Sequence, residues 1–241
     1  FRKLAEYHDG FLMDIRRFLK GDEGMIPAFI WRERKNPERH AVMNYLAGHN
    51  GFTLMDAVSY DEKHNEANGE DNRDGTDYNY SWNCGEEGQS RKKKTLELRS
   101  RQLRNALVML YLGQGVPVLY GGDERGNSQS GNNNVYCQDN ELSWIKWKPG
   151  KAWEYLEEYV RQLIAFRKKH PVFRQAAELR QTDYLSCGHP DVSYHGKRAW
   201  LGDFENYSRS VGILYAGEYV AANSEGNESD DSFYAAYNMH W

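Results

Sequence analysis

The chain has 241 residues, enough for one medium-sized domain with room for part of a second. Its formal charge of −4 at pH 7 shows no basic surplus, and no apolar run reaches the roughly 18 residues of a membrane-spanning helix. We therefore expect no nucleic-acid partner and no membrane span.

The first element predicted along the chain is a helix over residues 9–20. Phe11, Ile15 and Phe18 recur at helical spacing and form one apolar stripe. Gly21 follows the last turn, where glycine commonly ends a helix. The charged, amphipathic character of this segment also differs from that of a signal peptide.

A short apolar run at residues 42–47 predicts a buried strand. A polar stretch follows over residues 59–94, rich in Asn, Asp, Glu and Gly and without clear periodicity. A connection of this length inside a compact domain is usually functional or disordered. Tyr78, Tyr80 and Trp82 favour an ordered loop, because disordered segments are poor in aromatic residues.

The next predicted elements are a helix over residues 95–112 and a strand over residues 116–120. A loop rich in Gly and Asn spans residues 121–140, and a helix with a clear apolar stripe covers residues 153–169. The alternation of helices and strands is typical of a parallel α/β structure, in which functional sites lie at the C-terminal ends of strands. Both long loops follow strands, so we expect the site there.

After about residue 174 the helical period is lost. Residues 210–215 and 232–237 have the pattern of strands, and the polar, Gly-containing segment between them indicates a small antiparallel domain. The chain ends within the second run, so we expect this domain to be incomplete. The predicted division is a domain at residues 1–175 and the start of another at residues 176–241.

The segment Gly48-His49-Asn50-Gly51 follows the strand predicted at residues 42–47. A lone histidine in such a place is more often a structural hydrogen-bond donor than a ligand contact. The surrounding sequence favours a ligand-contact role for His49 instead, because several polar segments closely match glycogen-debranching enzymes. The matching segments lie at residues 59–70, 72–76, 81–85, 131–134 and 136–141. Together they resemble the isoamylase-type glycogen-debranching enzymes of the alpha-amylase superfamily of glycoside hydrolases.

The resemblance implies a fold and a set of site residues. The fold would be α/β, namely the C-terminal portion of a (β/α)8 TIM barrel, about strands six to eight, followed by an antiparallel β-sandwich that is incomplete. His49 would hydrogen-bond sugar hydroxyls. Asn50 stands where the family has an Asp that binds the 2- and 3-hydroxyls and supports the transition state. Further residues expected to line the site are Arg73, Asp74, Asp123 and Glu124.

The catalytic carboxyls of the resembled family are expected elsewhere. Retaining glycosidases use two carboxyls about 5 Å apart, one as nucleophile and one as acid/base. In that family they come from barrel strands four and five, upstream of the residues present here. Asp123 and Glu124 do not replace them, because adjacent residues of a strand point to opposite faces, and we expect them to hold a strand end by hydrogen bonds. No metal and no organic cofactor is implied.

The expected parent activity is hydrolysis of α-1,6-glucosidic branch links in glycogen or related dextrins, with branched α-glucan as the bound partner. Three interpretations stay open: a piece of a working debranching enzyme that is inactive alone, a degenerate homologue that binds glucan without cutting it, and a structural fragment. Asn50 favours the second. A few βα units cannot close a barrel, so we also expect association with the missing N-terminal half or with another copy through open sheet edges.

Two polar runs have simpler interpretations. Residues 132–134 lie in a Gly-rich loop, where asparagines often stabilise turns through their own backbone, and we expect that role for most of them. The basic run at residues 91–94 is expected to be a solvated approach to the following helix.

The cysteines are few and odd in number, at Cys84, Cys137 and Cys187. Such a count argues against a disulfide framework and suits a reducing compartment, so we expect a cytoplasmic location. Their wide spacing matches no pair of zinc ligands. Because the chain begins at Phe1 and not at Met, we expect a fragment, a processed form or a piece cut for expression, and an upstream signal stays open.

Overall fold

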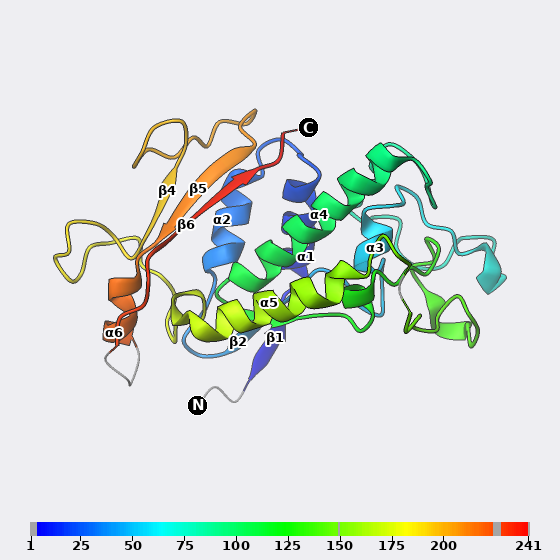
Figure 1. The fold of residues 1–241 in the computed structure, drawn as a ribbon, viewed down its shortest axis with the longest axis horizontal. Coiled ribbons are helices and arrows are strands. Elements are labelled where there is room, and N and C mark those ends of the chain that lie inside the picture. Colours follow the sequence, from blue (N-terminus) through cyan, green and yellow to red (C-terminus); the bar gives the residue numbers. More distant parts are fainter. Residues whose placement is uncertain (1–3, 149, 224–227, 241) are drawn as a thin grey trace. The chain divides into compact units, whose positions relative to one another are not determined.

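A computed structural model of the chain describes residues 4–148, 150–223 and 228–240 (Figure 1). Two compact units can be distinguished. The first comprises Phe1–Asn44, Met109–Pro117 and Ile164–Trp241, and the second comprises Tyr45–Val108 and Val118–Leu163. Neither unit matches the predicted domains at residues 1–175 and 176–241. That division stays a prediction.

One small sheet combines strands from the start and the middle of the chain. Strands β1 (Ala5–Tyr7), β2 (Ala41–Tyr45) and β3 (Val116–Val118) form one sheet in the order β1-β2-β3. Strands β1 and β2 are parallel, with Ala5 opposite Ala41. Parallel neighbours need a crossover connection, and here it consists of helices. The strand predicted at residues 42–47 is thereby confirmed, as is the parallel α/β character of this part.

The crossover contains α1 (Asp9–Leu19) and α2 (Ile26–Arg34). The predicted helix at residues 9–20 is confirmed, and its stripe is buried. The sequence pattern did not predict α2. This helix starts with Pro27 in its first turn and buries the charged Glu33, so its apolar periodicity is broken. The two helices pack through Phe18 and Phe29, whose rings stack with centroids 4.2 Å apart.

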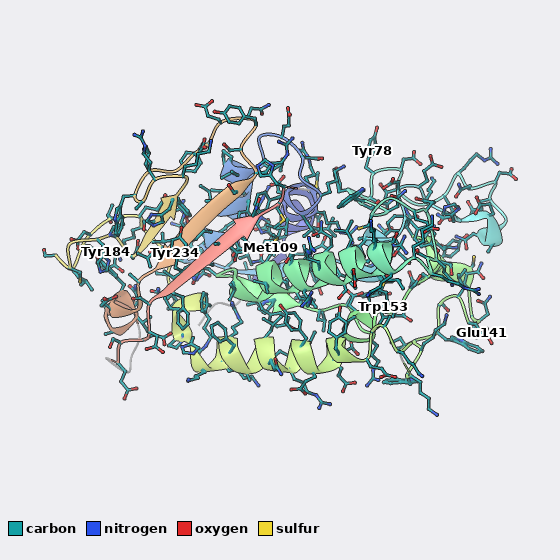
Figure 2. The ribbon with its side chains drawn as sticks, turned by 45° about the horizontal axis from the view of Figure 1, so that its top comes forward. Tyr78, Met109, Glu141, Trp153, Tyr184 and Tyr234 are labelled. Atoms are coloured by element: carbon teal, nitrogen blue, oxygen red, sulfur yellow. The ribbon has the colours of Figure 1, made fainter. Side chains whose placement is uncertain are left out.

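Three further helices belong to the middle of the chain: α3 (Leu54–Ala57), α4 (Lys93–Leu112) and α5 (Tyr155–Lys169). The predictions at residues 95–112 and 153–169 are confirmed. The polar stretch before α4 contains only a short 3-10 turn, Glu66–Asn68, among its described elements. From this stretch Tyr78 projects with 77% of its surface exposed (Figure 2). None of the described helices is both long enough and apolar enough to cross a bilayer.

The C-terminal part forms an antiparallel sheet of β4 (Val192–His195), β5 (Ser210–Tyr215) and β6 (Phe233–Asn238), in that order (Figure 1). Helix α6 (Val220–Asn223) lies between β5 and β6 along the chain. The strands predicted at residues 210–215 and 232–237 are confirmed, and they pair with Ser210 opposite Asn238. Strand β4 was not predicted. A sandwich needs two sheets. The described residues of this region form a single sheet, so the sandwich stays a proposal.

Candidate functional site

The predicted site residues His49 and Asn50 lie just after β2, in the second unit. Both are exposed, and among the described residues neither side chain makes a hydrogen bond. The adjacent Gly51 N–H donates to the carbonyl oxygen of Asn133 at 2.9 Å. Phe52, which follows, is fully buried. The two candidate residues therefore form an exposed tip whose polar groups are available, on a loop with a buried and hydrogen-bonded base.

Helix α3 fixes the C-terminal side of this tip. Thr53 caps the helix by accepting a hydrogen bond from the Asp56 N–H at 3.1 Å. The Leu54 N–H donates to the buried carboxylate of Asp123 at 2.9 Å. Two free N–H groups at the helix start are thus satisfied, one locally and one from a distant loop.

Asp56 is a structural anchor of the candidate site that the sequence interpretation missed. Its fully buried carboxylate accepts a hydrogen bond from the Ser128 hydroxyl and one from the Gln129 N–H at 2.8 Å. Burial raises the pKa of Asp56 to about 6, although these donors favour the charged form. The pattern Thr53-x-x-Asp56 is a capping-box signal that could have marked the helix start, but it gives no sign of the second loop.

A buried pair of amides joins the two long loops. Asn65 Nδ2 donates to Asn133 Oδ1 at 2.9 Å, and the Asn133 N–H donates to Asn65 Oδ1 at 2.9 Å. Asn133 Nδ2 also donates to the Thr76 carbonyl at 2.7 Å and to Asn79 Oδ1 at 2.9 Å. Asn65 and Asn133 are at most 1% exposed. We call Asn65, Asn68, Asp74, Asn79 and residues 132–134 the amide network.

The role predicted for residues 132–134 is therefore largely wrong. One local bond of the expected kind exists, from the Asn134 N–H to Asn132 Oδ1 at 2.9 Å. The other side-chain bonds cross to the earlier loop, as from Asn132 Nδ2 to Asn68 Oδ1 and from Asn134 Nδ2 to Asp74 Oδ2, each at 2.9 Å. A primary amide offers two donors and an acceptor, so in a buried loop it can pair with amides far away in sequence.

Asp74 and Arg73 differ in their surroundings. The Asp74 carboxylate accepts hydrogen bonds from Asn68 at 2.7 Å and from Asn134, and the Asn68 bond is the main reason that the pKa of Asp74 lies below its usual range. Arg73 is 80% exposed and contacts Asp71 at 3.3 Å. Asp74 thus belongs to the amide network, whereas Arg73 lies outside it and is accessible to a ligand.

Asp123 and Glu124 lie in a 3-10 turn, Asp123–Arg125, within the loop predicted over residues 121–140. Strand β3 ends at Val118, and Gly122, at φ +100°, holds a conformation that interrupts a strand. The predicted hydrogen-bonding role does occur, because Asp123 accepts from Leu54 and Glu124 accepts from the Gly122 N–H at 2.9 Å. Asp123 stabilises the base of the candidate site without facing solvent.

Arg99 on α4 explains why the polar stretch before that helix is ordered. Its buried guanidinium donates to the carbonyl oxygens of Gly88 at 2.6 Å and Asn83 at 3.0 Å, and to that of Glu86. One rigid donor group therefore holds three separate points of the loop against α4. This residue was not singled out from the sequence, because an arginine on a helix is usually solvated.

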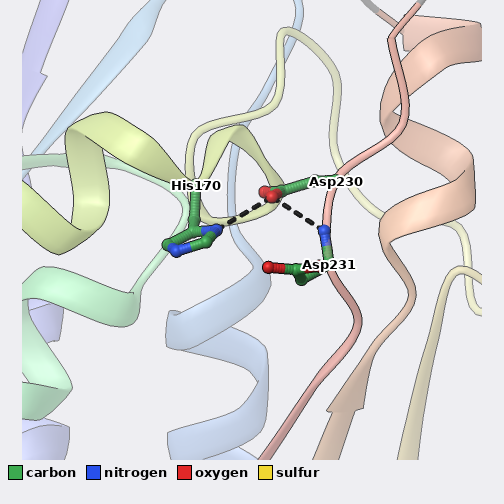
Figure 3. Close-up of side chains that lie close together, drawn as sticks. All are labelled: His170, Asp230 and Asp231. Carbon is green, nitrogen blue, oxygen red and sulfur yellow. Dashed lines mark hydrogen bonds and ion pairs between the residues drawn. The ribbon is translucent and has the colours of Figure 1, made fainter.

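A second group of polar residues, in the first unit, has ligand types that suit a metal ion: His170, Asp230 and Asp231 (Figure 3). Asp230 Oδ1 lies 2.9 Å from His170 Nδ1 and accepts the Asp231 N–H, while Oδ2 accepts the Val172 N–H at 3.0 Å. Both carboxylate oxygens thus hold the turn after α5. The sequence implied no metal, and these hydrogen bonds account for the cluster without one.

Comparisons with known proteins bear on this arrangement. No family model matches the chain. The glycogen operon protein GlgX homolog of Mycobacterium tuberculosis is 36% identical over 257 residues, which cover 98% of this chain and 35% of that protein. The chloroplastic isoamylase 1 of Arabidopsis thaliana is 42% identical over 235 residues, covering 91% of this chain and 29% of that protein. The chain is a homologue of the GlgX and isoamylase proteins.

The resemblance to isoamylase-type glycogen-debranching enzymes is thereby confirmed. The chain spans about a third of the length of the curated GlgX relatives that it matches. Among solved structures, an apo pullulanase from Paenibacillus barengoltzii superposes with a TM-score of 0.64 at 19% identity, covering 98% of this chain and 31% of that one. A type I pullulanase from Bacillus subtilis complexed with maltose gives 0.63 at 14% identity, covering 98% and 28%. At such identities the likeness concerns the fold.

Proposed function

We propose that this chain supplies glucan-binding loops of a glycoside hydrolase that cleaves α-1,6-glucosidic branch links in glycogen or related dextrins. The observation that carries the proposal is the exposed His49–Asn50 tip, which makes no hydrogen bond among the described residues and stands on a buried, hydrogen-bonded base. Support comes from homologues named glycogen operon protein and isoamylase, and from the pullulanase fold.

The two tip residues have different parts in this proposal. The His49 imidazole offers one donor and one acceptor, which match the vicinal hydroxyls of a glucose unit. The Asn50 amide can bind the same hydroxyls through Nδ2 and Oδ1, but it is neutral. An oxocarbenium-like transition state is stabilised by negative charge, which an amide does not supply. Arg73, which is exposed, is proposed as a further sugar contact, with Asp74, Asp123 and Glu124 supporting the loops.

We further propose that the chain alone does not hydrolyse glucans, because the family's nucleophile and acid/base are expected on barrel strands four and five. The test incubates the purified chain with pullulan and with glycogen and measures reducing ends. We expect release equal to that of a buffer blank. Release above the blank, from protein shown free of contaminating amylase, would contradict this part of the proposal.

A second candidate function is glucan binding without cleavage, and Asn50 favours it. The test is Asn50→Asp in the longest available form of the protein that includes the expected carboxyls. Restoring one preorganised charge is expected to raise kcat on the order of 100- to 1,000-fold. An unchanged kcat in an otherwise active enzyme would show that Asn50 is not at the position of the family's Asp. No activity in either variant would favour the binding function.

We also propose that the partner of the parallel sheet is the rest of the barrel or, in its absence, a second copy. Strand β1 lies at the edge of the sheet order and all three of its residues are exposed. Leu4 and Tyr7 are 72% and 63% exposed. An open edge with apolar side chains invites pairing with another chain. Light scattering on the chain is expected to show association, and a monodisperse monomer at micromolar concentration would contradict it.

A cytoplasmic location stays a prediction from the free cysteines.

A further inference from the structure

The first unit contains buried polar groups that make no hydrogen bond among the described residues. They are both carboxylate oxygens of Glu33 on α2, Nδ2 of Asn44 on β2, and the phenol oxygens of Tyr215 on β5 and Tyr237 on β6. The four side chains are 2%, 0%, 1% and 7% exposed, respectively. We call them the Glu33 cluster. Buried polar groups in proteins are nearly always hydrogen-bonded, so this concentration of unpaired ones needs an explanation.

The members of the Glu33 cluster lie near one another. Burial raises the pKa of Tyr215 and of Tyr237 well above the usual range, and the charge of Glu33 raises both further. Asn44 Nδ2 and Glu33 Oε2 flank the same glycine, since a Cβ built on Gly113 would lie 3.3 Å from the first and 3.5 Å from the second. Tyr237 also packs against Phe29 of α2, one turn before Glu33, with ring centroids 4.8 Å apart. None of the phenol and amide donors hydrogen-bonds to the Glu33 carboxyl among the described residues.

Arg167 on α5 is the nearby cation, and its donors are already committed. Its terminal nitrogens donate to the carbonyl oxygens of Tyr111 and Gly113 at 2.7 Å and of Gly115 at 2.7 Å, at the C-terminal end of α4. Its positive charge lowers the pKa of Glu33, but burial dominates and leaves that pKa well above the usual range. Arg167 therefore offsets charge without forming a hydrogen bond to the carboxyl.

The chemistry of the cluster selects its ligand. A cation would suit Glu33 but would be repelled by Arg167 and would find no acceptor on Asn44 Nδ2. An anion would be repelled by Glu33, and an apolar ligand would leave every group unpaired. Water both donates and accepts, and a buried water typically makes about three hydrogen bonds. We propose that Glu33, Asn44, Tyr215 and Tyr237 bind a small cluster of ordered water molecules that bridges the carboxyl to the amide and the phenols.

This water site has a structural consequence within the first unit. Glu33 and Asn44 belong to the helix and strand of the parallel part, whereas Tyr215 and Tyr237 belong to the antiparallel sheet. Bridging waters would therefore link two parts of the unit that share few direct polar contacts through these residues. A side chain at Gly113 would press on the amide and the carboxyl, since its Cβ would lie 3.3 Å from Asn44 Nδ2 and 3.5 Å from Glu33 Oε2.

The test combines crystallography with solution counting of long-lived waters. A high-resolution structure of the chain, or of the parent protein that contains it, is expected to show ordered density within hydrogen-bond distance of Glu33 and of at least one phenol. Direct Glu33–tyrosine hydrogen bonds with no density between them would overturn the proposal, as would anomalous signal from a metal ion.

The solution measurement counts long-lived water molecules by ¹⁷O relaxation dispersion. It compares the wild type with a variant whose added methyl group lies beside the proposed water site. Gly113→Ala places a Cβ beside Asn44 and Glu33 and is expected to reduce the number of long-lived waters by at least one. Gly121→Ala is the matched control, because its added Cβ makes an ordinary contact, 3.8 Å from Ile145. An unchanged count in Gly113→Ala would overturn the proposal. If that variant does not fold, Tyr237→Phe provides the same comparison by removing one partner of the waters.

Discussion

Two buried polar groups of this molecule are built in opposite ways. In the amide network of the second unit, every side-chain donor and acceptor of Asn65 and Asn133 has a protein partner. In the Glu33 cluster of the first unit, neither carboxylate oxygen and neither phenol has one among the described residues. Primary amides can pair with each other and with the backbone, whereas a buried carboxyl with no direct donor needs a small partner such as water.

The difference suits what each group holds. The amide network stabilises irregular loops that have no helix or sheet of their own, and one of its members accepts the N–H of Gly51 beside the candidate tip. Direct bonds give such loops a single geometry, which a ligand site needs. The members of the Glu33 cluster belong to regular elements, α2, β2, β5 and β6, which do not depend on these side chains for their backbone geometry, so bridging waters suffice there.

The largest expected effect comes from removing the cation beside the Glu33 cluster. Arg167→Met leaves Glu33 without its compensating charge and frees the carbonyls at the end of α4. Leaving these buried carbonyl oxygens unpaired typically costs about 1 to 3 kcal/mol each, so we expect a loss of at least about 3 kcal/mol of unfolding free energy. Urea unfolding followed by circular dichroism measures it. Arg161→Met on the same helix is the control, since Arg161 is 68% exposed and an exposed pair contributes about 0.5 kcal/mol. Equal losses in both variants would show that neither the carbonyl bonds of Arg167 nor its charge beside Glu33 contributes to stability.

The next effect probes the amide network. Asn133→Ala leaves partners on Asn65, Thr76 and Asn79 unpaired, at about 1 kcal/mol for each lost bond, so we expect a loss of about 3 kcal/mol. Hydrogen exchange at the Gly51 amide should also become faster. Asn140→Ala, on an exposed turn, is the control and should cost about 1 kcal/mol or less. A loss no greater than the control's would mean that the loops are held by other contacts.

A pH titration sharpens the same comparison at Asp56. Burial raises its folded pKa from 3.8 to about 6, so the folded state keeps a proton that the unfolded state has released. Stability from this group is therefore present below pH 4 and is lost as the pH rises towards 6, by about 2 kcal/mol over that range. The difference in unfolding free energy between the wild type and Asp56→Asn, measured by urea unfolding at several pH values, isolates the contribution of Asp56. A difference that does not vary with pH would refute the shifted pKa.

The smallest effect is expected at Tyr237. Its hydroxyl has no protein partner among the described residues, so Tyr237→Phe removes a bond to water only and should change the unfolding free energy by less than about 1 kcal/mol. The same denaturation assay measures it beside Asn133→Ala. A loss as large as that of Asn133→Ala would show that the phenol bonds directly to the protein, and the contrast between the two groups would disappear.

The sequence predicted what local periodicity can encode. The stripes of α1, α4 and α5 and the short apolar runs of β5 and β6 are regular enough to be recognised. Helix α2 was missed because Pro27 and the buried Glu33 interrupt its pattern. Nothing in a sequence marks a glutamate as buried when its neighbours in space are tyrosines of distant strands.

The candidate site shows the same limit. His49 and Asn50 were found because their segment and the surrounding loops resemble a known family. The supports were not, since Asn65 and Asn133 are 68 residues apart and each alone is an ordinary loop residue. For Asp123 and Glu124 the expected hydrogen bonding is present, but the sequence did not indicate that Asp123 would bond to the start of α3. Pairings between distant loops depend on the folded chain, and single-sequence patterns do not contain them.

The most direct test of the central claim asks whether the exposed tip contacts a branched glucan. A branched α-limit dextrin is titrated into the isotope-labelled chain, and the ring signals of its histidines are followed by NMR. The account predicts that the His49 signals shift, and that His49→Ala weakens binding at least tenfold while His240→Ala, an exposed histidine of the first unit, leaves it unchanged. Dextrin binding that is equal in the wild type and in His49→Ala, with no shift at His49, would contradict the account.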